Sequence, residues 1–266
     1  MIKIMFYKTL FFIFYSIWNR LPLTARKPIG DCIQNFRKKY LIKTFHSGLG
    51  QDYWVIHTVF NYKKNGFFVE AGAADGVSGS NSYILEHSYD WTGICVEPNP
   101  VFYDELVKNR KCITSSHCLG EDEETIEYII KGGHSGIVAD DTDNAINKPP
   151  KIINSSQIKN EIISLKTISL DKLLLYYNAP SVIDYLSLDV EGAETRVFKH
   201  FDFSKYTFLC LTIERPTAEL NNLLFNNGYH FVKNQLWDTF YVHESIPNFK
   251  LIKKSFFKQV NPKFPT

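Results

Sequence analysis

The chain lacks closely spaced cysteine pairs. It has five cysteines, an odd number, and no two of them stand at the Cys-x-x-Cys spacing of a zinc or redox motif. This argues against a disulfide framework and against a zinc site. Cys95 and Cys210 lie inside apolar runs that are typical of buried strands. We therefore expect buried, reduced thiols and a cytoplasmic protein.

The apolar segment near the N-terminus lacks the length of a membrane span. Residues 9–18 follow Lys3 and Lys8 and fall well short of the roughly 20 residues that a spanning helix needs. They also lack a small-residue cleavage site of the kind that follows a secretory signal peptide. An interfacial or docked amphipathic helix fits better, so residues 1–20 are a candidate for peripheral contact with a membrane.

Excess positive charge is missing from the centre of the chain. The net charge is +2, but residues 1–43 hold nine Lys or Arg against one acid, and residues 244–266 hold five Lys against one acid. Residues 44–243 hold 16 basic and 26 acidic side chains, a net charge of −10. An acidic centre argues against a nucleic-acid groove. The basic ends fit either an anionic membrane surface or solvated arms.

The chain divides into four regions by composition and periodicity. Residues 1–30 form an apolar and basic arm, residues 31–47 a helical lead-in, residues 48–245 the main domain and residues 246–266 a basic tail. Within the main domain, short apolar runs alternate with segments of helical periodicity. This alternation predicts an α/β fold with a mostly parallel sheet, helices on both faces and a C-terminal antiparallel hairpin.

Residues 132–160 interrupt this alternation. They are polar and rich in turn residues, which predicts a long loop that faces a substrate. The predicted strands are residues 66–70, 92–97, 112–119, 125–130, 183–189 and 208–214, with a closing hairpin at 229–232 and 239–242. The predicted helices are residues 31–45, 54–62, 81–87, 99–110, 170–177 and 217–226.

Acidic residues end three of the predicted strands, namely Glu70, Glu97 and Asp189. Open α/β sheets bind ligands at the carboxyl ends of their strands, so these side chains mark the expected site. Glu97 stands 21 residues after Gly76. This is about the interval, ~20 residues, at which a Rossmann acid bonds the ribose hydroxyls of a nucleotide.

The turn after Glu70 distinguishes between nucleotide-like ligands. A dinucleotide fingerprint needs glycines at relative positions one, three and six, whereas positions three and six counted from Gly72 are Ala74 and Val77. Glu70 and Asp75 would also repel a pyrophosphate. S-adenosylmethionine has no phosphate and carries an ammonium and a sulfonium. The charge of the turn therefore favours S-adenosylmethionine over a nicotinamide dinucleotide.

The strand-end acids belong to longer motifs, which are residues 50–52 (GQD), 67–76 (FFVEAGAADG), 80–82 (SNS), 91–100 (WTGICVEPNP) and 186–194 (LSLDVEGAE). In this order they resemble the FkbM-type methyltransferases. The resemblance covers residues 48–243 and implies a Rossmann-like class I methyltransferase fold. It also implies methylation of hydroxyls, often on sugars, glycans or natural products. Ala74 stands where a bacterial branch often has asparagine, and Ser82 where a sister branch has threonine, so the subfamily and the acceptor stay open.

The resemblance implies a role for each matching residue around the cofactor. Glu97 would hold the ribose, and Pro98 and Asn99 would lie beside the adenine. Cys118 and Leu119, at the end of the third strand, would flank the adenine. The residues that would line the methionine end are Glu70, Gly72, Ala74 and Asp75.

The candidates for catalysis lie at and just after the end of the predicted strand at 183–189. Methyl transfer to an alcohol needs an aligned nucleophile and a group that removes its proton. Asp189 is the first choice and Glu191 the second, either as the base or as a pair that holds a divalent metal. Glu194 could face the same cleft or begin the next helix as a favourable N-terminal acid.

Three other residues are weaker candidates. His134 lies in the glycine-rich stretch 132–136 and could reach a substrate, although a lone loop histidine is more often idle. Glu214 and Arg215 end another predicted strand, where an internal ion pair is favoured over a substrate contact.

Three classes of function fit the sequence unequally. An O-methyltransferase that acts on a small-molecule or glycan acceptor is favoured. The alternative is a non-catalytic binding or trafficking protein that keeps the methyltransferase fold. The presence of all three strand-end acids favours the enzyme. A nicotinamide-dependent oxidoreductase is disfavoured by the glycine spacing.

Overall fold

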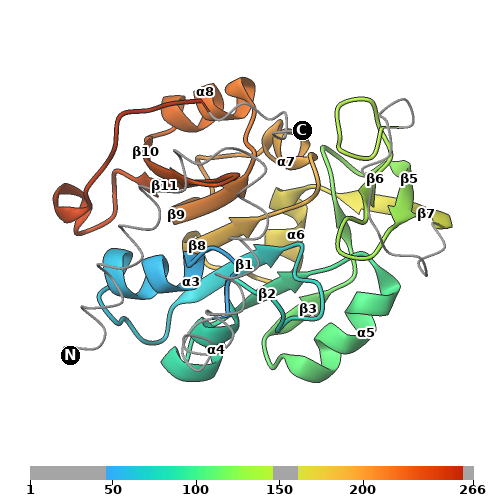
Figure 1. Ribbon diagram of the computed structural model, residues 1–266, viewed down its shortest axis with the longest axis horizontal. Coiled ribbons are helices and arrows are strands. Elements are labelled where there is room, and N and C mark those ends of the chain that lie inside the picture. Colours follow the sequence, from blue (N-terminus) through green and yellow to red (C-terminus); the bar gives the residue numbers. More distant parts are fainter. Residues whose placement is uncertain (1–45, 146–160, 260–266) are drawn as a thin grey trace, which may run out of the picture. The chain divides into compact units, whose positions relative to one another are not determined.

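The computed structural model describes residues 46–145 and 161–259 (Figure 1). The predicted arm, the predicted helix at 31–45 and the end of the basic tail lie outside the described residues. His46–Pro262 cluster as one compact unit. In the part of the chain that is described, no helix is both long and apolar enough to cross a bilayer.

A seven-stranded sheet of order β10-β11-β9-β8-β1-β2-β3 forms the centre of this unit. The five strands from β9 to β3 run parallel to their neighbours. β11 pairs antiparallel with both β9 and β10. The α/β fold is therefore confirmed, with a mixed sheet consistent with a methyltransferase-like fold. The strands are β1 (Phe67–Ala71), β2 (Thr92–Val96), β3 (Ile113–Ser115), β8 (Val182–Leu188), β9 (Thr207–Glu214), β10 (Tyr229–Gln235) and β11 (Asp238–His243).

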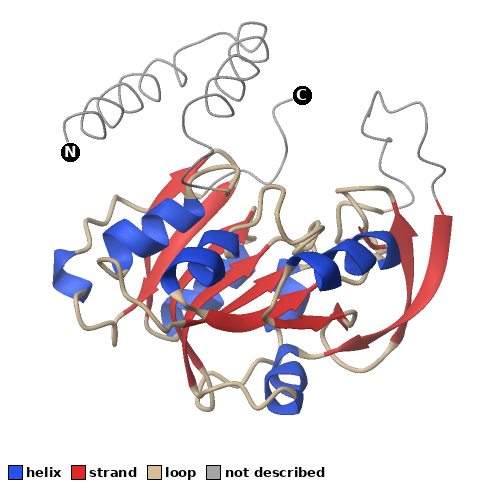
Figure 2. Ribbon diagram, turned by 90° about the horizontal axis from the view of Figure 1, so that it is seen from below, coloured by secondary structure: helices blue, strands red, loops and turns tan. Residues whose placement is uncertain are grey.

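Helices cover both faces of the larger sheet, because alternate residues of each strand supply an apolar surface on each side (Figure 2). One face packs against α6 (Leu170–Tyr176), α7 (Glu194–Phe198) and α8 (Ala218–Asn226). The other face packs against η1 (Trp54–Val59), α4 (Tyr83–Tyr89) and α5 (Pro100–Asn109). Two short helices complete this part of the chain, α3 (Gln51–Tyr53) and η2 (Phe249–Leu251).

A second, four-stranded sheet of order β4-β7-β5-β6 lies to the right of the larger sheet in Figure 1. The sequence pattern missed β7, because its mixed polar and apolar residues become a strand through pairing with β5. The predicted strand at 112–119 is divided between the two sheets as β3 and β4, and β6 lies inside the predicted loop at 132–160. The strands are β4 (Cys118–Leu119), β5 (Thr125–Ile130), β6 (Gly136–Ile137) and β7 (Glu161–Ile168).

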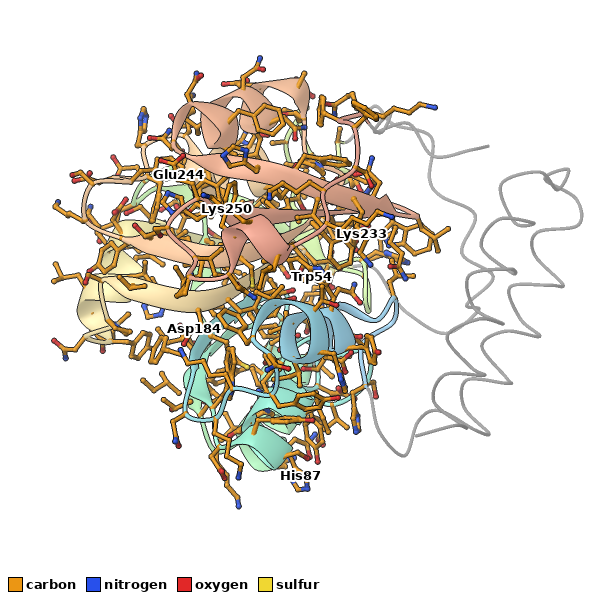
Figure 3. All side chains as sticks on the ribbon, turned by 90° about the vertical axis from the view of Figure 1, so that its left-hand side faces the viewer. Trp54, His87, Asp184, Lys233, Glu244 and Lys250 are labelled. Atoms are coloured by element: carbon orange, nitrogen blue, oxygen red, sulfur yellow. The ribbon has the colours of Figure 1, made fainter. Side chains whose placement is uncertain are left out.

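Trp54 joins the segment before β1 to the C-terminal hairpin. It is buried on the π-helical turns of η1, and its ring meets the edge of Phe240 of β11 at 5.0 Å between centroids. Figure 3 shows Trp54 between these turns and the hairpin strands. The predicted helix at 54–62 is thus shorter than expected, and Asn61 and Tyr62 have left-handed backbone angles. This packing brings the GQD motif to the edge where β11 begins, since Gln51 donates to the carboxylate of Asp238.

Candidate active site

A cavity opens at the carboxyl ends of β1, β2 and β8, which is the edge that the strand-end acids predicted. Gly72 is needed here because a Cβ on it would lie 1.9 Å from the backbone oxygen of Asp189. Of the sequence-predicted site residues, the cavity wall includes Gly72, Ala74, Glu97, Pro98, Cys118, Leu119, Asp189 and Glu191. The wall also includes Phe102 and Tyr128, which the sequence reasoning had not assigned, and part of the segment predicted to face a substrate, namely Gly132, Gly133, Ser135, Gly136 and Ile137.

Glu97 is a buried carboxylate whose position is set by two backbone groups. Its Oε2 accepts a hydrogen bond from the N–H of Ala74 at 2.9 Å, and its Oε1 accepts one from the N–H of Asn99 at 2.8 Å. Burial raises the pKa of Glu97 to about 7, while the two hydrogen bonds oppose that rise. Each carboxylate oxygen can accept more than one hydrogen bond, so Glu97 can still receive the vicinal hydroxyls of a ribose.

The wall beyond Glu97 is largely apolar and suits a flat ring. Phe102 comes from α5, and Tyr128 and Ile137 come from the smaller sheet. Cys118 is buried, and this burial, followed by the charge of Glu97, raises the pKa of its thiol to about 12. A neutral thiol behaves as a small apolar side chain, so Cys118 fits the expected position beside an adenine.

Glu70 does not lie on the cavity wall, which corrects its expected place at the methionine end. Its carboxylate is buried and accepts hydrogen bonds from the hydroxyls of Ser80 and Ser82 and from the N–H of Asn81. The guanidinium of Arg110 lies 3.4 Å away and supplies the opposite charge. Glu70 and the SNS motif therefore form a structural network behind the turn.

Asp75 and Asn99 are also placed off the wall. The carboxylate of Asp75 accepts hydrogen bonds from the N–H groups of Val77 and Ser78. Partial burial opposes its ionisation, but these hydrogen bonds lower the pKa of Asp75 overall. Asn99 caps α5 by accepting from Val101, as its position before Pro100 predicted, and its amide also donates to Ser135. Both residues shape the turns that carry the cavity rather than its surface.

Acidic side chains gather at the end of the cavity near β8. Asp189 borders the cavity and is exposed to it. Desolvation by the protein around its carboxyl group, and then the charges of Glu214, Glu191 and Asp238, raise the pKa of Asp189 above its usual range. Burial likewise raises the pKa of Glu194 to about 8. Glu194 does begin α7, but it is buried, and its carboxylate accepts hydrogen bonds from Val190 and Gly192.

The acidic end can share protons or hold a cation. Carboxylate oxygens of Asp189, Glu194 and Glu214 lie within 4.8 Å of one another. These three, rather than Asp189 with Glu191, are the residues that could bind a divalent metal. Without a bound cation, the raised pKa values of Asp189 and Glu194 favour their protonated forms.

Arg215 is the cation beside this acidic end. Its Nη2 lies 2.6 Å from Glu214 and 3.7 Å from Glu191, and it also pairs with Asp143. The internal ion pair expected for Glu214 and Arg215 is therefore confirmed. His134 lies on the other side of Glu191, with its Nδ1 3.1 Å from Oε1 of that carboxylate. The sequence offered no signal for this contact beyond the glycine-rich setting of the histidine.

Comparison with known proteins agrees with this geometry. The family model of the Methyltransferase FkbM domain matches residues 70–231, which is more than half of the chain. No curated protein matches the sequence.

Proposed function

The chain belongs to the FkbM methyltransferase family, and on that premise we propose that it transfers a methyl group from S-adenosylmethionine to a hydroxyl. The acceptor we propose is a sugar, a glycan or a small natural product. In this proposal the larger sheet is the Rossmann-like sheet of a class I methyltransferase. The strand order reverses between β1 and β8, because β2 and β3 follow on one side of β1 and β9 follows on the far side of β8. A ligand crevice is expected at such a reversal.

One observation carries the proposal. The carboxylate of Glu97 is fixed at the end of β2 by the N–H of Ala74, beside the turn where only a glycine fits. A ribose held by Glu97 would extend its base along Cys118 and Leu119 and its methionine end toward Gly72 and Asp189. A ligand with a cationic tail suits this order, because carboxylates gather at the Asp189 end.

For methyl transfer, the protein mainly has to align the acceptor hydroxyl with the methyl group and to remove the hydroxyl proton. S-adenosylmethionine, when bound, supplies a methyl group on a sulfonium that leaves as a neutral thioether. Gly72 lets the turn after β1 lie against the backbone of Asp189, so that both residues border the proposed methionine end. Asp189 and Glu191 are the carboxylates that we propose face the reacting centre. An acceptor hydroxyl placed against them would be aligned for in-line attack.

Cofactor binding is tested by the effect of S-adenosylmethionine on thermal unfolding. We expect the cofactor to raise the melting temperature of the wild type by mass action and to leave Glu97→Ala unshifted, because the ribose contact is lost. Glu105→Ala is the matched control, since this exposed glutamate on α5 forms an ion pair with Lys108 and does not line the cavity. Titration calorimetry gives the affinities directly. A wild type that shows no heat of binding would remove the proposal.

Methyl transfer is tested by a screen of alcohols. Methyl glycosides, free sugars and polyols are offered with S-adenosylmethionine, and released S-adenosylhomocysteine is measured. Turnover with any of them supports the enzyme. Tight cofactor binding without turnover across the panel would favour the alternative, a non-catalytic binding or trafficking protein. One observation keeps that alternative in view: Glu70 serves the fold, so only two of the three strand-end acids face the cavity.

A further inference from the structure

We infer that His134 and Glu191 form a proton-accepting pair that acts on the acceptor hydroxyl, with the imidazole as the base and the carboxylate as its orienting partner. This inference rests on the proposed function, because it assigns the proton step of the same reaction. His134 comes from the segment between β5 and β6, and Glu191 from the turn after β8. Only the folded chain brings them together, across 57 residues of sequence.

The pair lies where the cavity meets solvent. Glu191 borders the cavity, and 11% of its side chain is exposed. The side chain of His134 is 48% exposed, and the residues on either side of it, Gly133 and Ser135, line the cavity. An acceptor at the cavity mouth would therefore meet the imidazole, and a proton taken there has a short route to water.

The position of Glu191 is fixed on several sides. Its backbone is left-handed, with φ 56°, which is costly for a residue that has a side chain. The carbonyl of Glu191 accepts a hydrogen bond from the N–H of Asp143 at 3.0 Å, and Arg215 lies 3.7 Å from its Oε2. Gly136 leaves room for it, since a Cβ on Gly136 would lie 3.1 Å from the Cβ of Glu191. Backbone strain held in this way is concentrated at functional sites.

The segment that carries His134 is tied to the cofactor side of the cavity. The hydroxyl of Ser135 accepts from the N–H of Lys131 at 2.8 Å and from the amide of Asn99 at 3.0 Å. Asn99 in turn donates its backbone N–H to Glu97. The carbonyl of His134 accepts from the amide of Asn144 at 3.3 Å. These bonds hold the imidazole in register with the residue proposed to bind the ribose.

The proton step balances with the groups named. The hydroxyl oxygen of the acceptor attacks the methyl carbon, the C–S bond breaks, and its electron pair remains on sulfur as the sulfonium becomes a thioether. The hydroxyl proton passes to Nε2 of His134, while Nδ1–H donates to Oε1 of Glu191. The imidazolium so formed lies beside a carboxylate and releases its proton to water. Asp189 is a poorer proton acceptor. Desolvation and the charges of Glu214, Glu191 and Asp238 raise its pKa, which favours the form that already carries a proton.

The tautomer of His134 tests the pair without any acceptor. In ¹⁵N-labelled full-length protein, two-bond proton–nitrogen correlations at a mildly alkaline pH report which ring nitrogen carries the hydrogen. We expect Nδ1–H in the wild type and a shift toward Nε2–H in Glu191→Gln, because the carboxylate acceptor is lost. A wild-type imidazole with its hydrogen on Nε2 has no lone pair to offer there, and this result would overturn the inference.

Turnover tests the role in catalysis. With an alcohol that the wild type methylates, His134→Gln is expected to lose roughly 10²–10⁴-fold in turnover, the usual contribution of a general base. Its affinity for S-adenosylmethionine is expected to stay within about threefold of the wild type, since His134 is not itself one of the residues that line the cavity. Added free imidazole should restore part of the turnover of His134→Ala.

A matched control is present on the same domain. His200 pairs with Glu121 at 2.9 Å, is 63% exposed and does not line the cavity, so His200→Gln should keep wild-type turnover. Unchanged turnover in His134→Gln, with cofactor binding intact, would overturn the inference and leave the proposed function standing. If the wild type does not bind the cofactor, the proposed function is wrong instead. The tautomer measurement would still show whether His134 donates its Nδ1–H to Glu191.

Discussion

At the scale of single residues, the side chain at position 74 is linked to the backbone conformation of the turn. Ala74 lies on the cavity wall with a left-handed φ of 46°, a conformation that asparagine and glycine adopt more readily than alanine. The FkbM resemblance has asparagine at this position in many bacterial members, and the backbone angle supplies the physical reason. The N–H of Ala74 is the group that donates to Glu97, so the strained turn also positions the acid that we propose binds the ribose.

Replacing Ala74 should therefore stabilise the protein. Ala74→Gly relieves a left-handed conformation that costs roughly 1–2 kcal/mol, against a smaller loss from the freer unfolded chain. We expect a net gain of about 0.5–1 kcal/mol in the free energy of unfolding by urea denaturation. Ala218→Gly, at the first position of α8, is the control and should lose up to about 1 kcal/mol. A lower stability for Ala74→Gly would contradict this account.

At the scale of elements, β1 is joined to α4 and α5 by a buried ionic network. Arg110, directly after α5, is fully buried and contacts Glu70 of β1 and Glu86 of α4. Both acids lie close to the guanidinium, and Ser80 and Ser82 complete the hydrogen bonds. The SNS motif thus holds the strand and the two helices in register, and the cavity turn is built on that frame.

Removal of the cation should leave Glu70 and Glu86 without their opposite charge. Arg110→Met is expected to lower the free energy of unfolding by about 3–5 kcal/mol, the usual cost of breaking a buried ion pair. Lys108→Met, at an exposed lysine two residues earlier that pairs with Glu105, should change it by less than about 0.5 kcal/mol. Urea denaturation of both variants measures the difference. Equal stabilities would show that the network contributes nothing.

For the whole molecule, buried acids with raised pKa values couple folding to pH. Glu97 and Asp238 have pKa values raised by burial to about 7, and Glu194 to about 8. In the unfolded chain these groups return to ordinary values near 4. Each therefore binds its proton more tightly in the folded protein.

Stability should consequently fall as pH rises. The folded state holds more protons than the unfolded state between about pH 4.5 and pH 8, so the free energy of unfolding decreases across that window. Glu194→Gln removes one of these protons from the balance and should flatten the decline. Urea denaturation of both proteins at about pH 5 and pH 8 measures the slopes. A steeper decline in Glu194→Gln than in the wild type would refute this reading.

The sequence by itself determined the family, the α/β class and the position of Glu97 on the cavity wall. These follow from short-range patterns: a strand, a turn that only small residues fit, and a second strand that ends in Glu97. The starts of the helices at 99–110 and 170–177 were predictable for the same reason, since their caps Asn99 and Ser169 accept from N–H groups two or three residues away.

Only the tertiary structure decided which acids face the cavity and which serve the fold. Glu70 turns to Arg110, 40 residues away, and Glu191 turns to His134, 57 residues away. The strand β7 likewise depends on its pairing with β5. Contacts over such separations depend on how the sheets and helices pack, and a local pattern of residues carries no information about that packing.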